Sequence, residues 1–488
     1  MSVSWLEGLP DAAMMRAGDA WAIDEQGIPS LELMERAGEG LARVVARVAP
    51  AGPVAVVCGK GNNGGDGLVA ALLLRASFRE VRVLLLSEDL EGDPAINLER
   101  LEGRHEPFSH EALEWAAVIV DAVLGTGFSG VPREPVLGAI LAMNAASAPV
   151  VSADIPSGVD ASTGEMAGAA VSAVATATFV ASKPGLWIEP GKTRAGTVEV
   201  VDIGIPDGAP YAPDVWLIRE EVLAEIPPRV RNSTKFDSGH VLVCGGSPGL
   251  TGAPCLAAEA AMRAGAGYVT ACLPEAVSAV VEARLLEVMT AALDVDEVIG
   301  RSARGGAMVV GPGMGRLADA EELARELARR AEVPLVLDAD GLNAHAGRLE
   351  DLTGRSAPTV LTPHEGELGR LLEIDSAEVK ARRLHHAREA ARRSGAIVVL
   401  KGDDTLVAEP GGRVAVNPGA TPALATAGTG DVLSGVLGAL LAKDMEPFAA
   451  ACAGVFLHAR AGRIAAERVG AEGVIDSDVI AALPHART

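Results

Sequence analysis

Short apolar runs alternate with helix-length segments along most of this chain, and this alternation limits the possible fold more than any other feature. The first set of runs comprises residues 54–58, 81–86, 118–121, 150–153 and 178–181, each followed by glycine, proline or acidic residues. Continuous apolar runs of this length are typical of strands that are buried on both faces of a parallel sheet. The pattern therefore predicts a βαβ series with right-handed crossovers.

A second set of runs follows after a stretch rich in proline and polar residues. It comprises residues 240–244, 268–273, 307–310, 334–337, 359–361 and 396–400. The chain has 488 residues, more than the ~250–300 residues that one hydrophobic core usually serves. We therefore expect two tandem three-layer α/β domains, residues 1–215 and 235–488. Residues 216–234, which include a short acidic helix at 219–226, are predicted to form the linker between them.

Composition narrows the classes of partner. The chain has 42 basic and 65 acidic residues, a formal net charge of −23, which opposes binding to nucleic acid or to an anionic membrane surface. The five cysteines include no CxxC pair, which argues against a zinc site and a disulfide framework. The N-terminal segment has no basic, then apolar, leader pattern, and no apolar run is long enough for a membrane span. We expect a cytoplasmic protein.

Residues 59–67, GKGNNGGDG, follow a predicted strand and precede a helix at 68–74. Backbone amides at a helix N-terminus attract anions. The segment contains GxGxxG, so one interpretation is a nicotinamide oxidoreductase, with Glu88 or Asp89 as the ribose-binding acid. Asn62, Asn63 and Asp66 add oxygen atoms that a plain glycine turn lacks, which favours a bound ligand or a hard cation.

Three further polar residues stand at predicted strand ends. Asp121 ends one strand and precedes a glycine-rich turn, whose amides could approach a phosphate. Asp154 ends the next strand, and Ser157 lies in the DIPSG segment that it begins. The carboxyl ends of parallel strands line one crevice, so these residues are expected to converge with Asn63 and Asp66.

The NNGGDG run, Asp121 with its glycine loop, and DIPSG resemble the epimerase domain of the NAD(P)H-hydrate repair enzymes, over about residues 10–215. The resemblance implies a Rossmann-like domain in which Asn63, Asp121 and Ser157 hold a potassium ion. It implies that Asp154 transfers a proton at the hydrated nicotinamide carbon. The substrate-binding residues implied are Asn62, Asn63, Asp66, Gly125, Thr126, Gly127, Phe128, Ser129, Gly130, Val131 and Asp154.

The most specific motif is NPGATPALATAGTGD, residues 417–431, which runs into an apolar helix at 432–442. Gly428 and Gly430 allow the backbone to close around a phosphate at the helix N-terminus. A carboxylate there would repel a bound anion. Asp431 therefore fits a base that accepts a proton from a hydroxyl group attacking that phosphate.

This segment resembles the ribokinase-like superfamily and, more narrowly, the ADP- or ATP-dependent NAD(P)H-hydrate dehydratases, over about residues 230–485. The segments VVGPGMG, LDADGLN, LTPHEGEL and KGDDT appear in that family's order. The resemblance implies a ribokinase-like domain with Asp431 as the catalytic base. It implies that Ala253, Gly313, His364 and Asp431 contact the hydrated cofactor. The implied nucleotide-binding residues are Lys401, Gly402, Asp403, Asp404, Thr405 and Gly430, and Asn417 and Glu367 are candidates to position magnesium.

Together the two resemblances predict an enzyme that epimerises hydrated NAD(P)H and then dehydrates its S form at the expense of ADP or ATP. The alternative is a ribokinase-like vitamin or sugar kinase fused to a non-catalytic nucleotide-binding module. We expect a homo-oligomer, although no segment specifies its interface. The sequence does not distinguish ADP from ATP or hydrated NADH from hydrated NADPH.

Overall fold

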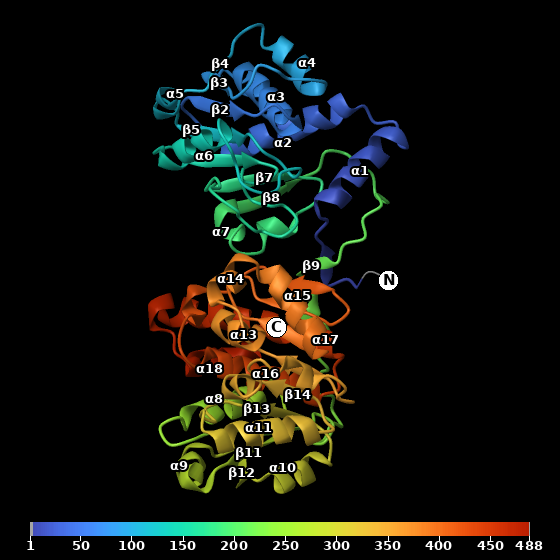
Figure 1. Cartoon of the computed structure of the whole chain (residues 1–488), viewed down its shortest axis with the longest axis vertical. Coiled ribbons are helices and arrows are strands. Elements are labelled where there is room, and N and C mark those ends of the chain that lie inside the picture. Colours follow the sequence, from blue (N-terminus) through green and yellow to red (C-terminus); the bar gives the residue numbers. More distant parts are fainter. Residues whose placement is uncertain (1–2, 488) are drawn as a thin grey trace. The chain divides into compact units, whose positions relative to one another are not determined.

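The computed structural model describes residues 3–487, which form two α/β units (Figure 1). One unit runs from Gly8 to Val215. The other comprises the chain from Trp216 onward together with the segment that precedes Gly8. Residues 216–234, predicted to be a linker, thus belong to the second unit. Residues 1, 2 and 488 of the predicted domains lie outside the described residues.

The Gly8–Val215 unit is built on a seven-stranded parallel sheet, in the order β4-β3-β2-β5-β6-β7-β8. Its strands are β2 (Val54–Cys58), β3 (Val81–Leu85), β4 (Glu106–Pro107), β5 (Val118–Ala122), β6 (Val150–Ala153), β7 (Ala175–Phe179) and β8 (Thr197–Val201). Successive residues of a strand point to opposite faces. Val56 accordingly packs into the core on one face of the sheet and Val57 into the core on the other.

Helices cover both faces of this sheet (Figure 1). α2 (Ser30–Val48), α3 (Asn62–Ala76) and α4 (Asp93–Arg100) contribute to one core, and α5 (His110–Glu114) and α6 (Val136–Ala145) to the other. α1 (Ala12–Asp24) precedes them, and the short α7 (Lys192–Ala195) precedes β8. This is the three-layer arrangement expected from the alternating sequence pattern.

One local prediction needs correction, and one helix was not predicted. The strand predicted at 178–181 is β7, at Ala175–Phe179, because Val180 has a φ of 66° and leaves the extended conformation. The run Ala175 to Thr178 is weakly apolar, so its burial was not evident from hydrophobicity. α1 was not predicted either, although Asp11 caps it by accepting hydrogen bonds from the amides of Ala13 and Met14, both 2.8 Å long.

The second unit contains an eleven-stranded sheet, in the order β1-β9-β18-β17-β16-β15-β14-β13-β10-β11-β12. The first two strands are β1 (Leu6–Gly8) and β9 (Val215–Ile218). The parallel strands are β10 (His240–Cys244), β11 (Tyr268–Leu273), β12 (Met289–Ala292), β13 (Ala307–Val310), β14 (Leu335–Leu337), β15 (Thr359–Leu361) and β16 (Ile397–Leu400). β17 (Leu406–Ala408) and β18 (Val414–Val416) continue antiparallel.

Pairing of β1 with β9 explains why residues 216–234 are not a linker. The amide of Arg219 donates to the carbonyl of Trp5 at 2.9 Å, so the predicted linker begins with a strand of the second sheet. The predicted acidic helix follows as a 3₁₀ helix at Glu220–Glu225. Pairing between strands so far apart in sequence leaves no local signal.

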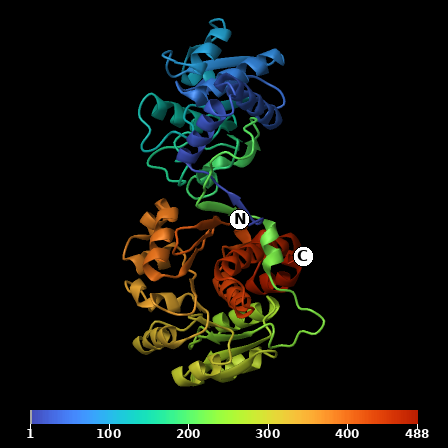
Figure 2. The same cartoon turned by 90° about the vertical axis from the view of Figure 1, so that its right-hand side faces the viewer.

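The helices of this unit are α8 (Gly252–Arg263), α9 (Glu275–Arg284), α10 (Val295–Ser302), α11 (Ala318–Arg330), α12 (Asp340–Asn343), α13 (Glu365–Leu372), α14 (Ser376–Ala381), α15 (Arg383–Ser394), α16 (Thr429–Ala442), α17 (Pro447–Val469) and α18 (Asp476–Ala486). α8, α16, α17 and α18 pack together against one face of the sheet, and Figure 2 shows the last three in red. Gly435 lets α16 approach α8, since a Cβ there would lie 2.1 Å from the carbonyl oxygen of Ala257. Among residues 3–487, no helix combines the length and apolar character needed to cross a membrane.

Candidate functional sites

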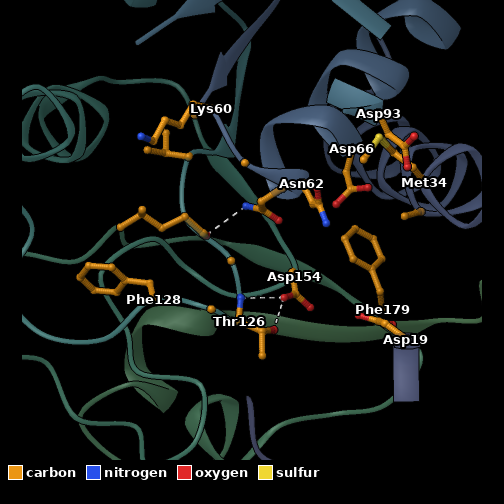
Figure 3. A pocket seen from close by; sticks show the side chains of 18 of the residues that line it. Asp19, Met34, Lys60, Asn62, Asp66, Asp93, Thr126, Phe128, Asp154 and Phe179 are labelled. Atoms are coloured by element: carbon orange, nitrogen blue, oxygen red, sulfur yellow. Dashed lines mark hydrogen bonds between the residues drawn. The ribbon is translucent and has the colours of Figure 1, made fainter. Parts of the chain in front are cut away.

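A cavity of about 920 Å³ opens at the carboxyl ends of the strands in the Gly8–Val215 unit (Figure 3). Eight of the predicted substrate-binding residues line it: Asn62, Asn63, Asp66, Gly125, Thr126, Gly127, Phe128 and Asp154. Ser129, Gly130 and Val131 continue the same loop but are not among the lining residues. The convergence expected from parallel-strand geometry therefore extends to most of the predicted set.

Close backbone approach brings the two glycine-rich loops together. A Cβ on Gly59 would lie 2.1 Å from the carbonyl oxygen of Val123, so no other residue fits there without displacing a strand end. Next to this contact, the Asn63 carboxamide donates to the carbonyl of Leu124 at 3.0 Å. The first loop thus holds the second in place.

Asp121 is fully buried beneath these loops and accepts hydrogen bonds from neutral groups. Ser157 Oγ donates to it at 2.6 Å, the Ser157 amide at 2.9 Å and Ser152 Oγ at 2.8 Å. Burial raises the pKa of Asp121, and the serine hydrogen bonds only partly oppose this rise. None of the partners that the described residues supply carries a positive charge. Asp121 is therefore a buried carboxyl group without a cationic partner among the described residues, and a bound cation would offset its charge.

Asp154 follows β6 in a left-handed conformation, with a φ of 62°. Its Oδ1 accepts a hydrogen bond from Lys183 Nζ at 2.5 Å, and its Oδ2 accepts one from the Thr126 amide at 3.0 Å. Burial disfavours the charge of Asp154, but the Lys183 ammonium and the Thr126 donors outweigh it and lower the pKa of Asp154. The Thr126 amide, predicted to be available to a phosphate, is thus used to hold this carboxylate.

Two residues of this site were missed from the sequence. Lys183 lies just after β7, is completely buried, and also donates to Thr178 Oγ1 at 2.7 Å. Asp19 of α1 lines the cavity. Burial and the neighbouring charge of Asp154 raise the pKa of Asp19 to about 6, although Lys183 opposes the rise. Asp19 belongs to no strand-end motif, so the pattern gave no signal for it. Lys183 lies two residues after the predicted strand 178–181, where strand-end position could have pointed to it.

The second candidate site lies at the N-terminus of α16. Gly428 caps this helix with a φ of 104°, which strongly favours glycine. Asp431 lies in the first helical turn. Burial and the neighbouring Asp338 raise the pKa of Asp431 to about 7, although Lys401 opposes the rise. A carboxyl group with such a pKa can accept a proton near neutral pH.

Lys401 links the predicted parts of this site. Its Nζ lies 3.0 Å from Asp338 Oδ1 and 3.5 Å from Glu367 Oε2. A Cβ on Gly430 would lie 3.3 Å from the same Nζ, so the glycine loop adjoins this lysine. Asp338 was missed as a site residue, although it lies in the LDADGLN segment directly after β14, where strand-end position could have pointed to it.

The predicted nucleotide loop, residues 401–405, turns on itself. Thr405 Oγ1 donates to the carbonyl of Gly402 at 2.7 Å. The Asp404 carboxylate points inward, where Arg383 Nε donates to it at 3.0 Å. The carbonyl of Asp403 accepts a hydrogen bond from the amide of Ala420 at 3.1 Å, which joins this loop to the segment that precedes Asp431.

The predicted cofactor contacts Ala253 and Gly313 are neighbours, since a Cβ on Gly313 would lie 3.1 Å from Ala253 Cβ. His364 caps α13, and its Nδ1 accepts a hydrogen bond from the Gly366 amide at 3.0 Å. The Asn417 carboxamide is buried, and neither of its polar atoms has a hydrogen-bond partner within residues 3–487. An unpaired buried amide of this kind fits a group that contacts a bound ligand or ion.

Residues 241–485 match the family model described as NAD(P)H-hydrate dehydratase, and residues 30–185 match the one described as YjeF-related protein N-terminus. The bifunctional NAD(P)H-hydrate repair enzyme Nnr of Moorella thermoacetica is 39% identical over 508 residues, covering 98% of this chain and 96% of that protein. The protein of the same name from Salinibacter ruber is 41% identical over 525 residues, covering 97% of this chain and 95% of its own.

A ribokinase-like superfamily protein of Enterococcus faecalis, of solved structure, matches with a TM-score of 0.50 and 24% identity. The match covers 57% of this chain and 96% of that one. At this identity the likeness concerns the fold alone, and it agrees with a ribokinase-like arrangement.

Proposed function

The chain belongs to the family of bifunctional NAD(P)H-hydrate repair enzymes, and on that premise we propose that its two units perform successive reactions on hydrated NADH and NADPH. The Gly8–Val215 unit interconverts the R and S epimers at C6 of the hydrated nicotinamide ring. The unit beginning at Trp216 dehydrates the S epimer to NAD(P)H, with ADP or ATP as co-substrate. Similarity along almost the whole length of such relatives disfavours a vitamin or sugar kinase fused to a binding module.

The dehydration rests on one observation above all: Asp431 lies in the first turn of α16, beside the Gly428–Gly430 loop and near Lys401. Asp431 removes the proton of the C6 hydroxyl as its oxygen attacks the terminal phosphorus of the nucleotide. The nucleotide leaves with the electrons of the broken P–O bond, and the loop amides and Lys401 stabilise the charge on the transferred phosphoryl group. Phosphate, a far better leaving group than hydroxide, then departs from C6 with assistance from the ring nitrogen.

Nucleotide binding is assigned to residues 401–405 and Gly430, and contact with the hydrated cofactor to Ala253, Gly313, His364 and Asp431. Because the Asp404 carboxylate pairs with Arg383, Asp404 contacts the nucleotide through its backbone. Magnesium, held by Glu367 and Asn417, would supply charge neutralisation for the phosphates when bound. Three acidic residues, Asp338, Glu367 and Asp431, surround Lys401. The single positive charge of the lysine does not balance them, and this excess of negative charge suits a divalent cation.

In the first unit the substrate occupies the cavity between the two glycine-rich loops, and Asp154 exchanges a proton with the C6 hydroxyl. Potassium, held by Asn63, Asp121 and Ser157, would offset the buried charge of Asp121 when bound. We also propose a cytoplasmic location and a homo-oligomeric state.

One assay tests both activities. Hydrated NADH of mixed epimers is supplied with ADP or ATP and magnesium, and the absorbance of reduced nicotinamide is followed. We expect recovery of both epimers with at least one nucleotide, and no recovery with either would contradict the dehydratase assignment. Asp431→Asn should abolish recovery. Asp154→Ala should keep the fast phase of the S epimer and slow the rest to the spontaneous rate, so recovery of both epimers at the parent rate would contradict the epimerase assignment.

A further inference from the structure

Inversion at C6 by opening of the C6–N1 bond requires two proton transfers, and Asp154 accounts for only one of them. In the hydrated ring C6 is bonded both to a hydroxyl group and to the ring nitrogen N1. If the C6–N1 bond opens, a base must take the hydroxyl proton while an acid protonates N1. This reasoning rests on the proposed epimerase function, and it calls for a second titratable group that faces the same cavity.

Asp154 is suited to the role of the base. Its contacts with Lys183 and Thr126 favour the ionised carboxylate. A nearby acid should instead favour the protonated carboxyl group, because opposed protonation states in one site distinguish the acid from the base.

Asp19 reaches the cavity from a different element, α1, which contributes four lining residues: Met15, Arg16, Asp19 and Ile23. Figure 3 shows Asp19 and Asp154 among the side chains around the same space. Within residues 3–487, Asp19 forms no hydrogen bond or ion pair that would occupy its carboxyl group. Its polar atoms therefore stay available to a ligand in the cavity.

Packing fixes the position of Asp19 along α1. The preceding residue, Gly18, lies against Tyr211, since a Cβ on Gly18 would be 2.4 Å from the Tyr211 hydroxyl oxygen. At the start of the helix, Asp11 holds the first amides. α1 is thus anchored at its N-terminus and at the turn that carries Asp19, as a group that must meet a reacting atom requires.

We infer that Asp19 is the proton donor that works with Asp154 in the epimerisation, the two carboxyl groups acting on N1 and on the C6 hydroxyl of the hydrated ring. Asp154 takes the hydroxyl proton, and the O–H electron pair forms the C6 carbonyl. The C6–N1 bond breaks, its electron pair stays on N1, and N1 receives the proton of Asp19. After rotation of the aldehyde, N1 attacks the other face of the carbonyl, returning its proton to Asp19 while the oxygen regains the proton held by Asp154.

The titration of the two groups supports this division of roles. Burial and the charge of Asp154 raise the pKa of Asp19 to about 6, whereas the pKa of Asp154 is lowered. Asp66, another lining residue, has its pKa raised well above the usual range by burial and by Asp154. Asp66 is therefore a competitor for the same role and must be included in the test.

The experiment uses the full chain with mixed epimers of hydrated NADH, saturating nucleotide and magnesium. For Asp19→Asn we expect the fast phase of the S epimer to be unchanged and the rate of the R epimer to fall by about 10²–10⁴-fold. Asp24→Asn is the matched control, because Asp24 is an exposed residue of the same helix outside the cavity. A wild-type enzyme that fails to accelerate the R epimer would refute the proposed function itself, not the role of Asp19.

Two further measurements separate chemistry from folding. Asp19→Asn should unfold at a temperature no lower than that of Asp24→Asn, because the raised pKa of Asp19 means that its charged form destabilises the folded unit. Asp19→Glu, which keeps a carboxyl group, should epimerise the R epimer at least tenfold faster than Asp19→Asn. Parent-rate epimerisation by Asp19→Asn would overturn the inference. Equal losses in Asp19→Asn and Asp19→Glu, or a selective loss in Asp66→Asn alone, would overturn it as well.

The pH profile gives an independent readout. The charged and titratable groups near Asp19 are Arg16, Asp66, Asp154, Lys183 and Tyr211. Because the protonated form of Asp19 is the donor, kcat/KM for the R epimer should fall as the pH rises through its pKa. Asp19→Asn should lack this limb, and its persistence in that variant would assign the limb, and the donor role, to another group.

Discussion

Lys183 Nζ lies 2.5 Å from Asp154 Oδ1 in the interior of the first unit, where the lysine has no exposed surface. A buried ion pair contributes little net stability, yet loss of one partner leaves a charge without compensation. The pair therefore serves the site chiefly by holding Asp154 ionised and in one orientation.

We expect Lys183→Met to abolish epimerisation and to lower the free energy of unfolding of the first unit by about 3–5 kcal/mol. Dehydration of pure S epimer should persist, since Lys183 lies in the other unit. Denaturant unfolding measures the stability change. The double variant Lys183→Met/Asp154→Asn, which removes both charges, should regain part of the stability but none of the activity, and a further loss would contradict the ion-pair account.

Asp431→Asn should stabilise the protein while it eliminates dehydration. A carboxyl group whose pKa is raised on folding binds more protons in the folded than in the unfolded state, so its charged form reduces stability above the unfolded pKa. Given the rise from 3.8 to about 7, we expect a gain of about 1–3 kcal/mol at neutral pH. The gain should vanish below pH 3.8, and calorimetry at two pH values checks the sign.

The same carboxyl group sets a pH dependence for dehydration. Because Asp431 acts as a base, kcat/KM for pure S epimer should rise as the pH increases through about 7 and then level off. Asp338→Asn removes a neighbouring negative charge, so the limb should move to lower pH. A limb that stays in place would show that another group limits the rate.

Arg383 should control the nucleotide loop. Its guanidinium is fully buried and contacts Asp404, Glu365 Oε1 at 2.8 Å and the carbonyl of Lys401 at 3.2 Å. Arg383→Met should cost about 3–5 kcal/mol of stability, and the milder Glu365→Gln should raise the KM for nucleotide more than the KM for S epimer. Arg392→Met, at an exposed position of the same helix, should change stability by less than about 0.5 kcal/mol. Equal effects at 392 and 383 would refute this role.

Potassium should stabilise the first unit specifically. We expect its thermal midpoint to be higher in KCl than in choline chloride of equal ionic strength, because a cation beside Asp121 offsets the buried charge. Asp121→Asn should remove the difference. An identical response in wild type and variant would argue against a site formed by Asn63, Asp121 and Ser157.

The sequence alone was sufficient for those features that depend on local pattern. Apolar runs predicted most of the parallel strands in both sheets, and polar residues at strand ends predicted the meeting of Asn63, Asp66 and Asp154 at one cavity. These predictions succeed because parallel strands all end at the same edge of a sheet. The position of Asp431 at a helix start, next to two glycines, was likewise predictable from the sequence. The glycine loop that lies beside Asp431 in the structure also precedes it directly in the chain.

Tertiary structure decided the rest. The pairing of β1 with β9 assigned residues 216–234 to the second unit, and the packing of α1 brought Asp19 to the cavity. Lys183 meets Asp154 only because β6 and β7 are adjacent strands. Each of these contacts joins two segments whose sequence patterns do not indicate that they meet. The periodicity of a helix or strand shows which of its faces is buried, but not which other element covers that face. The electrostatic state of the carboxyl groups, and with it their division into acid and base, therefore follows from the folded structure alone.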